Sequence, residues 1–64
     1  MDTNESRAAL KLQIAEAAMR DAAAELDAVG SKEAILHAKE LRGAAKIART
    51  WELDLRKIRS TGAG

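Results

Sequence analysis

Apolar side chains recur every seven residues in two stretches of this sequence, one on each side of Gly30. In the first stretch they alternate in steps of four and three, at Ala8, Leu12, Ala15, Met19, Ala22, Leu26 and Val29. In the second they continue, with one His among them, at Ala34, His37, Leu41, Ala44, Ala48, Trp51, Leu55 and Ile58. A seven-residue repeat is typical of helices that pack with a left-handed supercoil. The pattern therefore predicts two helices joined along an alanine-rich seam.

Start and stop signals divide the chain near its midpoint. Asn4 suits a helix N-cap, Gly30 suits the left-handed residue that ends a helix, and Ser31 can cap the next helix. We expect residues 1–60 to form one domain, with a helix at about 4–29, a turn at 30–31 and a second helix at about 32–59. Residues 61–64 should form a flexible tail. Because the turn is short, the two helices should run antiparallel.

A single hairpin of 64 residues is expected to bury too little apolar surface to be stable by itself. A domain of this size buries only about 60% of the surface that its unfolded chain exposes. The chain has no Cys, so disulfides and thiolate metal sites are excluded, and oligomerisation remains as the stabilising device. We therefore expect an all-α fold, in which coiled-coil-like antiparallel hairpins form a four-helix or larger bundle, with the homodimer as the expected oligomer.

Several apolar residues lie outside the predicted seam and are candidates for self-association. Large aliphatic side chains there include Leu10, Ile14 and Ile47. Ala9, Ala23, Ala38 and Ala45 are expected to line a shallow groove of small residues along one flank. The predicted self-association residues are Leu10, Ile14, Ala23, Ala38, Ala45 and Ile47.

No residue cluster has the spacing of a catalytic, cofactor or metal site. His37 is the only histidine, and we expect it at the seam, hydrogen-bonded to Glu33, Glu40 or a backbone carbonyl. A pH switch or a metal shared between two copies is the alternative, but a lone His lacks companion ligands at metal spacing. Acidic residues two apart, such as Glu25 and Asp27, point to different helix faces. We therefore predict no enzyme activity, no cofactor and no metal.

Charge is divided unevenly between the two halves. Residues 1–30 hold three basic and six acidic residues, whereas residues 31–64 hold eight and four. The second helix carries basic residues in two seven-residue rows, Lys32, Lys39, Lys46 and Arg42, Arg49, Arg56. This stripe could track phosphates without reading bases. A solvated face that keeps a bundle soluble is the interpretation we favour.

Net charge and hydropathy bear on where in the cell the protein is expected. The formal net charge is only +1 and no apolar run approaches the roughly 20 residues of a membrane span. The polar start, MDTNES, lacks the basic and apolar segments of a secretory signal. We expect a cytoplasmic protein with no membrane partner, and the small, Ala-rich, Cys-free chain would suit a phage or bacterial regulatory protein.

In layout, the chain resembles the Rop type of plasmid copy-control RNA-binding proteins. The shared features are two helices, a tight turn at mid-length, and seven-residue repeats with Ala in core layers. The resemblance implies an antiparallel four-helix bundle that binds paired RNA loops across one face.

The residues favour a non-enzymatic interaction protein. It would self-associate and act by regulating, inhibiting or adapting a macromolecular partner, expected to be a protein. The alternative is a Rop-like nucleic-acid-binding regulator that uses the basic stripe of the second helix.

Overall fold

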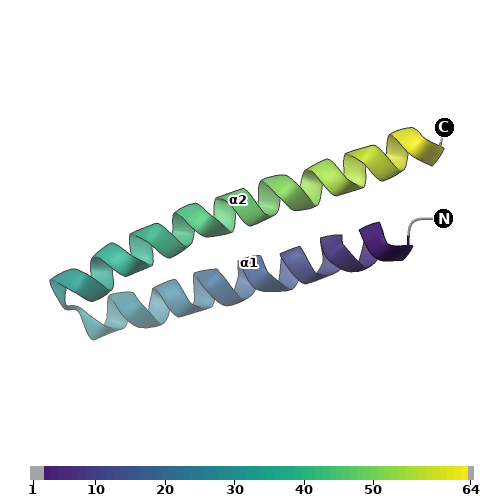
Figure 1. Ribbon diagram of the computed structural model, residues 1–64. Helices are drawn as coiled ribbons and strands as arrows, with labels where there is room; N and C mark the ends of the chain where they lie inside the picture. Colours follow the sequence, from purple (N-terminus) through teal and green to yellow (C-terminus); the bar gives the residue numbers. More distant parts are fainter. Residues whose placement is uncertain (1–2, 64) are drawn as a thin grey trace.

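Two long helices account for nearly all of the described chain. The computed structural model describes the backbone of residues 3–63 and the side chains of residues 4–57. Helix α1 spans Thr3–Val29 and helix α2 spans Lys32–Ala63. They lie side by side and antiparallel, with both ends of the chain at the same end of a rod (Figure 1). The predicted all-helical hairpin is confirmed.

The turn between the helices occupies two residues. Gly30 has a φ of 81°, in the left-handed region that glycine adopts without steric cost, and its amide donates to the Leu26 carbonyl at 3.4 Å. Ser31 then caps α2, because its Oγ accepts a hydrogen bond from the Ala34 amide at 3.1 Å. The chain thereby reverses with the ends of both helices hydrogen-bonded.

The far end of α2 differs from the expected tail. The helix continues to Ala63, so residues 61–63 are helical. Residue 64 lies outside the described residues.

The buried seam is made mostly of alanine. Its buried apolar side chains are Ala9, Ala23, Ala34, Ala38, Ala45 and Ala48, all at most 6% exposed. Larger side chains, half-buried, complete the rows at Leu12, Met19, Leu26, Leu41 and Leu55. Two charged residues, Glu16 and Glu52, occupy the same rows and are also buried. The seven-residue repeat is therefore present in both helices.

One of the two predicted rows on each helix was wrong by a single residue. In α1 the buried row contains Ala9 and Ala23 where Ala8 and Ala22 had been expected. In α2 the row contains Ala38, Ala45 and Glu52 in place of His37, Ala44 and Trp51. The physical reason is volume: alanine methyl groups let the helix axes approach closely, and an indole does not fit between axes at that spacing. Trp51 is 57% exposed.

Gly30 and Gly43 are expected to respond in opposite ways to the same substitution. A Cβ at Gly30 or at Gly43 would meet nothing within 4 Å, so no packing clash decides either result. Gly43→Ala should raise the free energy of unfolding by about 0.5–1 kcal/mol, because Gly43 lies inside a helix. Gly30→Ala should lower it by about 1–2 kcal/mol, because alanine is strained at positive φ. Urea unfolding followed by circular dichroism measures both, and changes of equal sign would contradict this explanation.

Candidate interaction surfaces

Two long flanks run beside the seam, and each takes one row from each helix. Residues seven apart share a helix face, so the rows next to the buried rows lie on opposite sides of the hairpin. We call the first the polar flank, made of Ser6, Gln13, Arg20, Asp27, Ile35, Arg42, Arg49 and Arg56. We call the second the alanine flank, made of Ala8, Ala15, Ala22, Val29, His37, Ala44 and Trp51.

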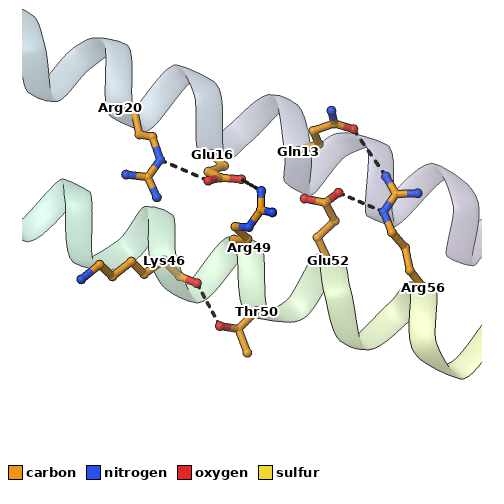
Figure 2. A network of polar contacts seen from close by, with 8 residues as sticks. All are labelled: Gln13, Glu16, Arg20, Lys46, Arg49, Thr50, Glu52 and Arg56. Atoms are coloured by element: carbon orange, nitrogen blue, oxygen red, sulfur yellow. Dashed lines mark hydrogen bonds and ion pairs between the residues drawn. The ribbon is translucent and has the colours of Figure 1, made fainter.

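Polar contacts between the helices cross the polar flank. Arg42 Nη2 donates to Asp27 Oδ2, and Arg56 Nη2 donates to Gln13 Oε1 at 3.4 Å. Figure 2 shows the part of this network around the middle of the hairpin. Because these contacts join α1 to α2 at separate levels, they help to set how far one helix is displaced along the other.

Two buried glutamates lie at the centre of this network. Glu16 accepts from Arg20 Nε at 3.1 Å and lies 3.9 Å from Arg49 Nη1, and Glu16 is only 9% exposed. Glu52 is 7% exposed, and its Oε2 accepts from Arg56 Nε at 2.9 Å (Figure 2). Its Oε1 is buried with no hydrogen-bond partner. Bonds to arginine therefore partly offset the desolvation of each carboxylate.

Sequence reasoning missed these glutamates, although a signal was present. Glu16 lies seven residues from both Ala9 and Ala23, and each buried glutamate has an arginine four residues later. A Glu followed by Arg at that spacing forms a pair on one helix surface. Bulk had instead favoured Trp51 over Glu52 as the seam residue.

The predicted self-association residues fall into two groups. Ala23, Ala38 and Ala45 are each 0% exposed, so the expectation that they line an open groove is corrected: they form the seam itself. Leu10, Ile14 and Ile47 are 54%, 59% and 51% exposed and face solvent in this hairpin. Helical spacing puts Ile47 beside Ala44 and Trp51, whereas Leu10 and Ile14 lie one turn apart on the outer side of α1.

The arginines and the lysines of the predicted basic stripe differ in their contacts. Its arginines, Arg42, Arg49 and Arg56, each pair with an acidic residue of the hairpin. Its lysines, Lys32, Lys39 and Lys46, are exposed and make no ion pair with the residues that the structure describes. The six side chains therefore do not form one uniform row of free positive charge.

His37 lies on the alanine flank, and its expected burial was wrong. Its side chain is 63% exposed, and Nδ1 lies 2.9 Å from Glu40 Oε1, one of the partners expected from the sequence. Within residues 4–57, no three His, Cys, Asp or Glu side chains gather in a way that could hold a metal ion.

Comparison with known proteins adds no functional assignment. No family model, curated protein or solved structure matches this chain. In the described residues, neither helix is both long enough and apolar enough to cross a membrane.

The buried glutamate at position 52 predicts a coupled response to mutation. Arg56→Ala should lower the free energy of unfolding by about 1–2 kcal/mol, because it leaves the Glu52 carboxylate buried without its donor. Adding Glu52→Ala should recover most of that loss, since it continues the alanine row and removes the charge. Urea unfolding of the two single variants and the double variant measures the coupling.

Arg42→Ala is the matched control for this pair. Its partner Asp27 is 41% exposed, so the loss should be below about 1 kcal/mol. Additive effects of the Arg56 and Glu52 substitutions would contradict the coupling.

Proposed function

We propose that this protein is a non-enzymatic helical hairpin that self-associates and acts by binding a macromolecular partner. One observation carries the proposal: no large side chain within the described hairpin is fully buried. Eight large apolar side chains are instead 49–69% exposed, namely Leu10, Ile14, Val29, Ile35, Leu36, Ile47, Trp51 and Leu53. Exposed apolar surface on this scale is typical of a protein that binds others.

The energetics of the seam support self-association. A buried methyl group contributes only about 0.8 kcal/mol, whereas a fully buried Leu or Ile contributes about 1.5–3 kcal/mol. The free energy gained by burying six alanines is therefore small beside the conformational entropy lost when two long helices become ordered. A second hairpin that covered part of the exposed aliphatic surface would complete the core.

The proposed partner beyond the second copy is a protein. Large aliphatic side chains occur on several faces, so a dimer that covers one face would leave others for a different macromolecule. Leu10 and Ile14 on α1 and Leu53 on α2 are three such residues. The proposed setting is the cytoplasm, on the sequence grounds given above.

Self-association predicts that stability depends on protein concentration. Between 1 and 100 μM, a homodimer that unfolds on dissociation should gain roughly 2–3 kcal/mol, since each tenfold change is worth about 1.4 kcal/mol. Sedimentation velocity and thermal unfolding by circular dichroism over this range measure mass and stability together. A fully helical monomer with a cooperative transition that does not shift with concentration would exclude the proposal.

The lysine row supports a second candidate, a nucleic-acid-binding regulator. Lys39 and Lys46 are exposed, lie two turns apart on one face, and make no ion pair in the described hairpin. Unlike the three paired arginines, they are free to neutralise phosphates. We rank this function second because only a few phosphates could be contacted.

A charge-reversal experiment decides between the two candidates. If the lysine row binds phosphates, the wild-type protein should bind duplex DNA or structured RNA with affinity that falls steeply as salt rises. The double variant Lys39→Glu/Lys46→Glu should then lose that binding while keeping its helicity. We expect no submicromolar binding at physiological salt in a fluorescence anisotropy titration. Salt-sensitive, submicromolar binding that the double variant abolishes would promote the second candidate.

A further inference from the structure

Among residues 4–57, no ion pair between α1 and α2 crosses the alanine flank. Its α1 row holds nothing larger than Val29, whereas its α2 row holds Trp51. Ile47 lies one turn from both Ala44 and Trp51, so it widens the apolar surface on the α2 side. The same face therefore presents small side chains from one helix and large ones from the other.

We propose that the alanine flank binds a second copy of this chain, related by a two-fold axis parallel to the long axis of the hairpin. This inference rests on the proposed self-association and names its surface. The axis places α1 of each copy against α2 of the other, so small residues meet large ones in both contacts. Every pair of neighbouring helices in the resulting four-helix bundle is antiparallel.

The levels of the residues along the rod support this arrangement. The contact between Glu16 and Arg49 joins the ends of two long side chains, so their backbone positions agree to within about one helical turn along the rod (Figure 2). Ala18 and Ala15 of α1 therefore lie within about one turn of the levels of Ile47 and Trp51 of α2. Rotation about the long axis preserves levels, so Ile47 and Trp51 of one copy lie over alanines of the other.

Charge complementarity also favours a second copy as the occupant. Lys11 follows the like-charged Arg7 by one turn, and it makes no ion pair with described residues of its own chain. Asp54 on α2 likewise has no ion-pair partner there and lies within about one helical turn of the level of Lys11. The two-fold axis brings each Lys11 beside the Asp54 of the second copy, which makes two reciprocal pairs.

The arrangement also has an electrostatic cost. Glu25 and Glu40 occupy equivalent places nearer the turn, so they repel across the interface. The polar flank is a poorer docking surface for a second copy, because its arginines already pair with acidic residues of their own hairpin and burying these ion pairs would cost desolvation. The alanine flank carries its charges only at the rim.

Two neighbouring alanines provide a matched test of the surface. Ala17 and Ala18 are both exposed, but helical geometry turns Ala18 toward the alanine flank and Ala17 toward the opposite side. Ala18→Glu should raise the dimer dissociation constant by at least about a hundredfold, because it buries an unpaired carboxylate. Ala17→Glu costs the helix the same propensity and should change it by less than about threefold.

Trp51 supplies an independent readout, because it is the single tryptophan of the chain. It is 57% exposed in the hairpin, so docking should shield the indole from water and shift its emission to shorter wavelength as concentration rises. The shift should accompany the change in sedimentation in wild type and in Ala17→Glu. Ala18→Glu should keep the long-wavelength emission, with helicity recorded for each variant.

Charge reversals test which helices face each other. Lys11→Glu and Asp54→Lys should each weaken the dimer about tenfold, and an equimolar mixture of the two variants should restore it. Lys11→Glu also creates a favourable pair with Arg7 one turn earlier, so a weaker dimer would not reflect a weaker helix. Glu25→Lys should tighten the dimer a few-fold, because it turns the repulsion from Glu40 into attraction.

Each contrary outcome has a distinct meaning. A monomer at every concentration overturns both this inference and the proposed function. A dimer that Ala17→Glu disrupts and Ala18→Glu spares overturns the flank alone, as does a mass that keeps rising with concentration. Weakening by Glu25→Lys overturns the two-fold arrangement, because it would place the two α1 helices against each other with Lys11 beside Glu25.

Discussion

The close packing of alanine against alanine is the interaction on which the rest of this hairpin depends. Helix axes can approach closely only where the side chains between them are small, and every fully buried apolar side chain in the described seam is an alanine. The consequence is a trade between geometry and energy. The helices are held in a tight, regular pair, yet each buried methyl contributes little free energy. The larger apolar side chains of the seam are only half-buried, and eight others are exposed on the outside of the hairpin.

Because the alanine seam is narrow, the side chains on its two flanks differ in the contacts that they make. On the polar flank, arginines of α2 reach across to Asp27, Glu16 and Gln13, which supplies the directional contacts that an alanine seam lacks. Methyl groups alone would tolerate a shift of one helix along the other. The buried Glu16 and Glu52 cost desolvation, which bonds from Arg20 and Arg56 of their own helices partly offset. Glu16 also meets Arg49 of the other helix. On the alanine flank, the described side chains form no ion pair between the two helices.

The sequence predicted the hairpin well and its seam only in part. Gly30 followed by Ser31 marks the reversal clearly, because few other residues suit a left-handed helix end and an N-cap. The seven-residue repeat also has the correct period. Its phase was wrong because adjacent alanines, such as Ala22 and Ala23 or Ala44 and Ala45, are equally apolar. Because the alanines did not distinguish the two phases, the bulk of Trp51 favoured the phase that buries it. The structure instead buries Glu52, so the seam contains a charged residue where an apolar one was expected. Interhelical pairing of the arginines depends on this phase, so it could not be found before the seam was known.

A displacement of one residue in the seam changes what each surface can do. Trp51 moves from an expected seam residue to an exposed side chain, whose environment would report on the proposed association. From the sequence alone the arginine row was expected to be a solvated face, with phosphate binding as the alternative; in the structure it makes contacts between the two helices. On the proposed two-fold arrangement, the missing part of the core is supplied only by a second copy. The chain would then fold and dimerise in a single coupled equilibrium, and the aliphatic side chains left outside the interface would be ordered in the same step. On that proposal, the fraction of the chain that is folded and able to bind a partner rises with the concentration of the chain itself.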